Sequence, residues 1–168
     1  MQRKDRQFGE VSEKIRRNMR NIRSKDTSVE VLLRKRLWHD GYRYRKNYKK
    51  LPGSPDIAIT KYKLALFCDS EFFHGKDWDK LKVRLERGKN PQYWLRHIEE
   101  NMERDRRVDR ELALLDWTVI RFWSNDIKKD LQGCLRFIEE TVFDSAMARG
   151  SLLIKTGIIN AASKIRAA

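Results

Sequence analysis

Four side chains that can hold a metal ion or move a proton lie within or beside two predicted strands. Asp69, Glu71 and His74 follow the apolar run LALFC, and Asp56 begins the strand before it. The period of two in an extended chain places Asp69 and Glu71 on the same face as Phe67. Carboxylate oxygens are ligands for Mg²⁺, and an imidazole titrates near neutral pH. We interpret the segment as a candidate metal and proton-transfer site. Alternatively, the aspartates only mark strand ends and the histidine is structural.

Two further acidic residues lie on the apolar faces of predicted helices. A long helix is predicted from Pro91 to about residue 115, and its period places Asp105 in the middle of the inward-facing stripe. A buried carboxylate needs a partner, which can be an arginine, a histidine or a metal-bound water. Glu30 also shares a face with leucines. Its spacing from Thr27 is that of a capping box, which could explain it without chemistry.

A hairpin must position the first group of candidates. Segments 56–60 and 64–69 are apolar and flank the polar stretch KYK, which predicts two neighbouring antiparallel strands. The apolar density of the second strand suits burial on both faces. We expect Asp56, at the start of the first strand, and Asp69, at the end of the second, to lie at opposite ends of this ladder. The hairpin alone therefore does not bring them together.

The remaining elements alternate between helices and strands. We predict a helix after the capping box, a strand over 42–48, a loop or lid over 76–90, the long helix, a strand over 116–123 and a helix from about 124 to 148. This order indicates an α/β fold with a mixed central sheet and helices on its faces. A basic, partly helical arm is predicted over 1–25, the main domain over 26–148, and a tail of unclear structure over 149–168.

The charge of the chain suits a polyanionic partner. Its 168 residues include 38 lysines and arginines against 24 acidic residues, a net charge of +14, which makes nucleic acid the leading candidate. Such a charge fits an enzyme and a plain binder equally well. No apolar segment approaches the roughly 20 residues of a membrane span, and no signal peptide is evident. Cys68 and Cys134 lack CxxC spacing. We expect a soluble, reduced protein of the cytoplasm.

Phe72 and Phe73 form an adjacent aromatic pair directly after the candidate carboxylates. In an extended chain both cannot face the core, so at least one is expected to be exposed or inserted into another molecule. Apolar side chains that enter between base steps are a known way of opening and kinking a DNA duplex.

Five motifs in this order resemble the very-short-patch repair (Vsr) DNA mismatch endonuclease family: DTSVE, LPGSPDI, LFCDSEFFHG, YWLRHIEENMERDRR and LDWTVIRFW. The resemblance covers about residues 14–140. It implies a restriction-endonuclease-like fold and a Mg²⁺-dependent enzyme, with Mn²⁺ as another possible cation. Members of this family nick one DNA strand beside T:G mismatches that arise by deamination of 5-methylcytosine.

The resemblance also implies roles for the candidate residues. Asp56 matches the first metal-binding carboxylate, and Cys68 matches the strand residue that offers its main-chain carbonyl to the metal. Asp69 stands at the next position, which is often acidic in relatives and can complete the metal site. His74 matches the catalytic histidine, and Asp105 matches the helix carboxylate that assists it.

Other implied roles concern the helix acid and the DNA contacts. Glu30 matches a further acid of the active site. Phe72 and Phe73 match the residues that intercalate beside the mismatch, and Met19 of the arm enters from the other side. In Phe73 this chain departs from the tryptophan usual in the family.

The segment HGKDWDK departs from the family pattern because it lacks the cysteine or second histidine with which a structural zinc site begins. We predict no structural zinc and expect Trp78 or the charged loop to hold this region. For Glu71 we favour a solvated side chain over an additional metal ligand. Double-stranded DNA is the expected partner of a monomeric, nucleoid-associated enzyme. Family association suggests mismatch-repair proteins and a cytosine-5 methyltransferase as further partners.

Two other functions fit the same residues. A restriction or structure-specific endonuclease of the same fold would use the same chemistry on other DNA. A non-catalytic, basic DNA-binding module would need neither Asp56 nor His74.

Overall fold

The computed structural model describes residues 25–147 of the chain. The basic arm, including Met19, and the tail from residue 148 lie outside the described residues, so the predicted division into arm, domain and tail stays a prediction. Within the described part, no helix combines the length and apolar character needed to cross a membrane.

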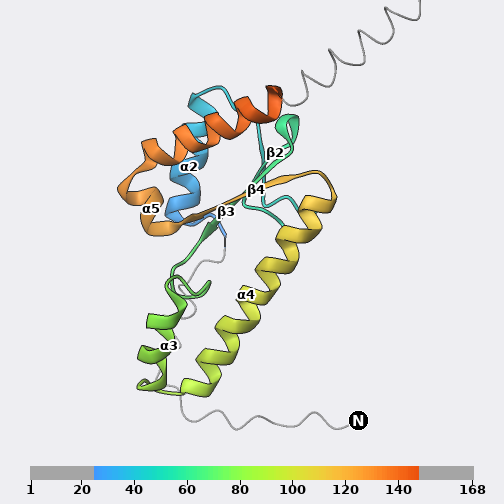
Figure 1. Ribbon diagram of the computed structural model, residues 1–168. Helices are drawn as coiled ribbons and strands as arrows, with labels where there is room; N and C mark the ends of the chain where they lie inside the picture. Colours follow the sequence, from blue (N-terminus) through green and yellow to red (C-terminus); the bar gives the residue numbers. More distant parts are fainter. Residues whose placement is uncertain (1–24, 148–168) are drawn as a thin grey trace, which may run out of the picture.

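A four-stranded mixed sheet forms the centre of the molecule (Figure 1). Its strands are β1 (Arg45–Lys46), β2 (Ile57–Ile59), β3 (Leu64–Asp69) and β4 (Thr118–Trp123), and they lie in this order. The β1–β2 and β2–β3 pairs are antiparallel, whereas β3 and β4 are parallel. The predicted α/β class, hairpin and central strand are confirmed.

Helices cover both faces of the sheet (Figure 1). One face packs against α2 (Ser28–His39), α5 (Ser124–Lys129) and the helical residues 131–147, and the other against α4 (Pro91–Leu114). Side chains of β3 alternate between the two cores: Leu64 and Leu66 enter the first, whereas Ala65 and Phe67 enter the second. This is why β3 is apolar at every position before Cys68.

Two predicted elements differ from the observed ones because of local backbone geometry. The strand over 42–48 is reduced to Arg45–Lys46, since Asn47 adopts a positive φ of 46°. The single helix predicted from 124 to 148 breaks at Asp130. The side chain of Asp130 accepts a hydrogen bond from the Gly133 N–H at 2.7 Å, which caps the helical residues that follow.

The segment 76–90 is not only a loop, because it contains α3 (Trp78–Glu86). Leu81 and Leu85, four residues apart among many charges, form a small apolar face that packs with Ile98 of α4. Trp78 is part of this cluster, as expected if its packing holds the region. Asn90 precedes α4 as predicted but makes no side-chain capping bond. Together α3 and the first half of α4 extend beyond the end of β3 (Figure 1).

Candidate active site

The hairpin brings Asp56 to the end of β3. Ile57 pairs with Leu66, so in an antiparallel register Asp56 lies beside the residues just before Asp69. The Cys68 N–H donates to Asp56 Oδ2 at 2.8 Å. Our expectation that the ladder separates Asp56 from Asp69 was wrong, because the start of one strand of an antiparallel hairpin is adjacent to the end of the other.

Asp56 and Cys68 are candidates for holding a cation through oxygen atoms. The N–H and C=O of one residue in an antiparallel strand point to the same side, so the Cys68 carbonyl is directed to the side of Asp56. Burial raises the pKa of Asp56 to about 6, against the lowering effect of the Cys68 hydrogen bond, and the negative charges of Glu30 and Asp69 raise it further. A bound cation would relieve this unfavourable burial of negative charge, so the donors fit a hard divalent ion.

His74 and Asp105 form the second half of the site. His74 Nδ1 lies 2.6 Å from Asp105 Oδ2 and 3.6 Å from Asp69 Oδ1. Burial acts to raise the pKa of Asp105, but the hydrogen bond with His74 and the charge of Arg121 outweigh it, so the pKa is lowered. An ionised Asp105 accepts a hydrogen bond from the Nδ1–H group, which leaves Nε2 as the ring nitrogen able to accept a proton from another molecule.

Gly75 allows the chain to place His74 against α4. It has a φ of +70°, and a Cβ atom there would lie 2.5 Å from Met102 Sδ of α4. On α4, the Asn101 amide donates to the Phe73 carbonyl at 3.0 Å and fixes the other side of the same turn. The segment from β3 to α3 is therefore held by close contact with the helix that carries Asp105.

Arg121 connects the acidic residues, and our sequence interpretation did not identify it. Its guanidinium lies 2.8 Å from Asp69 Oδ2, 3.5 Å from Asp105 Oδ1 and 3.0 Å from Asp109 Oδ1. Burial acts to lower the pKa of Arg121. The hydrogen bond to Asp109 and the negative charges of Asp69 and Asp105 outweigh it, so the pKa is raised. The sequence does contain a signal for Arg121. It stands between Ile120 and Phe122 in β4 and so points to the opposite face from them, and Asp105 and Asp109, four residues apart, share one face of α4.

Asp69, His74 and Asp105 could also hold a metal ion, because one ligand atom of each lies within 4.8 Å of the others. In this cluster, however, Arg121 already supplies a positive charge to both carboxylates. Asp56, in contrast, accepts a neutral N–H and has no ion pair among the described residues. The balance of charge therefore favours the Asp56–Cys68 side for the cation.

Comparison with known proteins identifies the family. The family model described as "DNA mismatch endonuclease Vsr" matches residues 10–80. The chain is 40% identical to the type II nicking enzyme V.NmeDIP of Neisseria meningitidis serogroup C, over 79% of this chain and 88% of that protein. It is 35% identical to the DNA mismatch endonuclease Vsr of Escherichia coli K12, over 64% of this chain and 67% of that protein.

The chain belongs to the Vsr family of DNA mismatch endonucleases. It is a DNA endonuclease, and the relatives support a nicking activity. The nicking enzyme V.HpaIIP of Haemophilus parainfluenzae is a further relative, 39% identical over 73% of this chain and 85% of that protein.

The acid that the Vsr resemblance places in the active site, Glu30, is engaged in the capping box. Its carboxylate accepts bonds from the Thr27 hydroxyl at 2.7 Å and from the Asp26 N–H at 2.9 Å. Glu30 is 3% exposed, and its negative charge raises the pKa of Asp56. Arg34, which is 6% exposed, pairs with Asp26, and its positive charge acts to lower the pKa of Asp56. Glu30 therefore contributes negative charge close to Asp56, while its oxygens accept hydrogen bonds at the start of α2.

The aromatic pair of this Vsr-family chain is half-buried, and Glu71 is not freely solvated. Phe72 and Phe73 contact each other with ring centroids 5.2 Å apart, and Phe72 lies 5.1 Å from the Trp94 ring. Glu71 accepts a hydrogen bond from the Asn125 N–H at 2.7 Å, near the start of α5. The two rings thus sit at the surface of a packed aromatic cluster, and Glu71 joins the turn to the start of α5, at the same end of the sheet.

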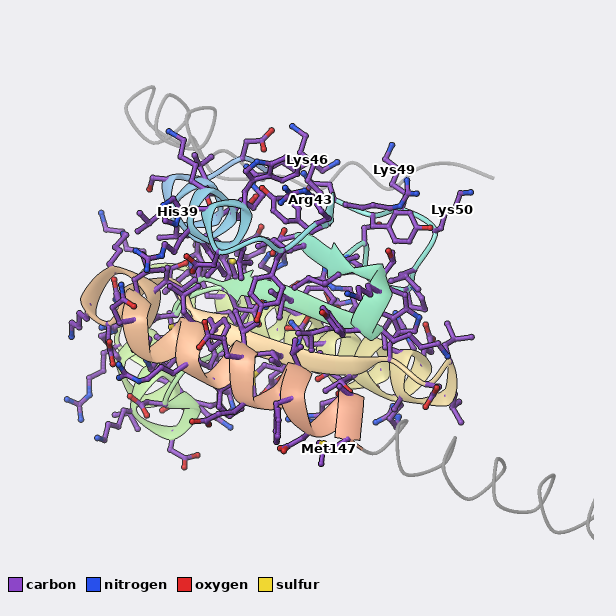
Figure 2. The ribbon with its side chains drawn as sticks, turned by 90° about the horizontal axis from the view of Figure 1, so that it is seen from above. His39, Arg43, Lys46, Lys49, Lys50 and Met147 are labelled. Carbon is purple, nitrogen blue, oxygen red and sulfur yellow. The ribbon has the colours of Figure 1, made fainter. Side chains whose placement is uncertain are left out.

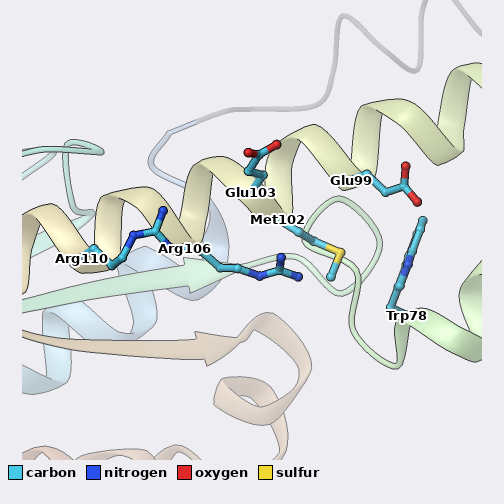
Figure 3. A pocket seen from close by; sticks show the side chains of 6 residues that line it. All are labelled: Trp78, Glu99, Met102, Glu103, Arg106 and Arg110. Carbon is cyan, nitrogen blue, oxygen red and sulfur yellow. The ribbon is translucent and has the colours of Figure 1, made fainter.

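Beside α4 lies a pocket of about 440 Å³, shown in Figure 3. Its lining is mixed in charge and consists of Trp78, Glu99, Met102, Glu103, Arg106 and Arg110. None of the candidate Vsr site residues lines it. The chemistry is therefore assigned to the end of β3 and not to this pocket.

Replacing Asp56 should stabilise the cation-free protein at high pH. A folded pKa of about 6, above the ordinary 3.8, means that the folded state binds the proton more tightly than the unfolded state. Asp56 therefore costs stability as pH rises from about 4 to 6, by up to roughly 3 kcal/mol. We expect Asp56→Asn to raise the free energy of unfolding by about 1–3 kcal/mol at pH 8 in EDTA, measured by urea denaturation.

Most of this gain should disappear at pH 4, where the folded wild-type carboxyl is protonated. An equal gain at both pH values would contradict the assignment of a raised pKa to Asp56.

Removing Arg121 should destabilise the protein strongly, because Asp69 is 5% exposed and would lose its cation. We expect Arg121→Met to lower the free energy of unfolding by about 2–4 kcal/mol at pH 7.5. The loss should be smaller at pH 3, because Arg121 lowers the pKa of Asp105 and this contribution to stability fades as pH falls below the ordinary value of 3.8. Chemical denaturation at both pH values measures this.

Arg107→Met is the matched control, since Arg107 lies as far as 3.9 Å from Glu111 and its side chain is 62% exposed. It should change stability by less than about 0.5 kcal/mol. A similar loss in both variants would show that the Arg121 contacts contribute nothing specific.

Proposed function

We propose that this Vsr-family endonuclease uses Mg²⁺ to nick one DNA strand beside T:G mismatches in very-short-patch repair. The observation that carries the proposal is the meeting, at the end of β3, of the hydrogen-bonded Asp56 and Cys68 with the His74–Asp105 pair. The family relationship supports DNA as the substrate. The residues between the two groups, Phe72 and Phe73, provide the aromatic contacts that a mismatch reader needs.

Asp56 and the Cys68 carbonyl would hold the cation, and Asp69 would be a further ligand only if it gave up part of its contact with Arg121. When bound, Mg²⁺ supplies positive charge to the phosphoryl group and to the attacking water. Burial raises the pKa of the Cys68 thiol, so its sulfur stays protonated and its carbonyl is the relevant donor. The ionised Asp56 carboxylate is required for this binding, which should weaken as pH falls below about 6.

His74 would act as the general base of the reaction. Asp105 accepts a hydrogen bond from Nδ1–H and fixes the ring, so that Nε2 can remove a proton from water as it attacks the phosphorus. Arg121 holds Asp105 ionised and occupies Asp69, which keeps the orientation of the histidine constant. Asp105 and Arg121 therefore act through His74 and are positioning residues.

The proposal extends to the surroundings of the enzyme. Residues 26–148 would form the endonuclease domain, with the arm over 1–25 carrying Met19 to the other side of the mismatch. A monomer acting on cytoplasmic, nucleoid-associated DNA would suffice, because one active site cuts one strand. Mismatch-repair proteins and a cytosine-5 methyltransferase are the partners that the family relationship suggests.

The wild-type protein should nick duplexes containing T:G in Mg²⁺ or Mn²⁺ but not in EDTA. Asp56→Ala and His74→Ala should each reduce the nicking rate at least about 100-fold, because metal binding or proton transfer is lost. Binding to the same duplex should change little. Single-turnover cleavage of a labelled strand and fluorescence anisotropy measure the two quantities.

His39→Ala is the matched control, since the His39 side chain is 79% exposed at the end of α2 and pairs with Asp40. Equal cutting of T:G and fully paired duplexes would favour a restriction-type endonuclease. Unchanged behaviour of Asp56→Ala and His74→Ala would indicate a non-catalytic DNA-binding module.

The aromatic pair should contribute mainly to mismatch recognition. Replacing Phe72 and Phe73 with alanine should weaken binding to T:G duplexes more than binding to paired DNA, by about 10-fold in the ratio, because stacking on a base is worth roughly 1–3 kcal/mol. Competition binding with both duplexes gives this ratio.

Phe143→Ala serves as the control, since this side chain is 63% exposed on the helical residues 131–147. Equal losses on both duplexes would argue against intercalation. Thermal melting separates this result from a loss of packing around Trp94.

A further inference from the structure

The chain between Asp40 and Asp56 contains no acidic residue and five cations. All five side chains are exposed, and we call them the basic ridge: Arg43, Arg45, Lys46, Lys49 and Lys50. In Figure 2 the labelled members project from the same side of the molecule, above β1. The ridge was not part of the motifs that identified the family.

The ridge is held in shape by aromatic residues between its cations. Tyr44 is half-buried and donates its hydroxyl to the Arg34 carbonyl at 3.1 Å, and Tyr48 packs on the core below β2. Arg43 lies 4.0 Å above the Trp38 ring. Over residues 42–45 the tyrosines are half-buried and the arginines are exposed, as the alternation of an extended segment predicts, whereas the three lysines are exposed without such alternation.

Little of the ridge charge is neutralised by the protein. Within residues 25–147, Lys46 has one ion pair, with Asp26 at 3.7 Å, and Arg43, Arg45, Lys49 and Lys50 have none. Several like charges held together on a surface favour a polyanion, because binding releases its condensed counterions.

The backbone of the ridge is bonded to the segment that carries Asp56. The Asn47 N–H donates to the Asp56 carbonyl at 3.1 Å, and the Tyr48 N–H donates to the Pro55 carbonyl at 3.0 Å. Lys46 pairs with Ile57 in the sheet. The ridge is therefore fixed one strand away from the candidate cation site, at the same edge of the sheet.

We propose that the basic ridge binds the phosphate backbone of the DNA duplex that flanks the nicked position, without reading its sequence. This inference rests on the proposed function, because it takes the scissile phosphate to lie at Asp56. Eight residues from 43 to 50 span at most about 26 Å if extended, which corresponds to about seven base pairs of duplex. The ridge adds affinity from flanking DNA and leaves the chemical step unchanged.

The test removes two ridge charges that make no contact needed for folding. We compare Lys49→Gln/Lys50→Gln with the control Lys128→Gln/Lys129→Gln, whose lysines are exposed on α5, after the opposite edge strand β4. Both double variants have the same net charge. Binding to a T:G duplex of about 30 base pairs is measured in EDTA between 50 and 300 mM salt by fluorescence anisotropy.

For the ridge variant we expect the dissociation constant to rise about 5- to 20-fold at 150 mM salt. The slope of log affinity against log salt should fall by about 1 to 2, since each lost phosphate contact contributes about 0.9. The control should match the wild type. On a duplex that ends within about three base pairs of the mismatch, all three proteins should bind alike, and the nicking rate at saturating DNA should be unchanged.

Equal slopes for the two double variants on the long duplex would overturn the ridge proposal. So would a loss by the ridge variant that persists on the short duplex. A wild-type protein that binds long duplexes with the predicted ridge dependence but does not nick T:G DNA would instead overturn the proposed function and leave the ridge standing.

Discussion

The whole site depends on how one buried strand ends. Because β3 is covered on both faces, every polar group at its last two residues must find a partner. The Cys68 N–H finds the Asp56 carboxylate on the antiparallel side, and Asp69 finds Arg121 on the parallel side. Asp56 therefore has no cationic partner among the described residues, whereas Asp69, on the neighbouring strand, is paired with Arg121. This difference in charge compensation distinguishes the proposed metal site from the proposed site of proton transfer.

The same constraint explains what the sequence could and could not predict. Glu30, Asp56, His74 and Asp105 carry chemistry in their residue types, and the period of α4 correctly put Asp105 on its inward face. The pairing of His74 with Asp105 depends on where the turn after β3 meets α4, which is distant in the sequence, and no local pattern encodes this. The adjacency of Asp56 and Asp69 could have been predicted, since the antiparallel hairpin itself brings them together.

Errors in the secondary structure have equally specific causes. The apolar face of α3 consists of Leu81 and Leu85, and two leucines among charged residues are too weak a pattern to predict a helix. Their role is explained only by their packing with Ile98 of α4. The break at Asp130 depends on one side-chain bond to the Gly133 N–H inside an otherwise continuous helical pattern. Arg121 was overlooked because an arginine in a strand is usually solvent-facing, whereas here β4 is covered by α4.

The short edge strand has a consequence for how copies of the protein meet. A long exposed β-edge invites another chain to add itself to the sheet, and cells tolerate such edges poorly. Here β1 pairs through only two residues, ends at the left-handed Asn47 and is bordered by lysines, so a second molecule finds no register in which to continue the ladder. The β1 edge of the sheet therefore offers little backbone for the addition of another strand.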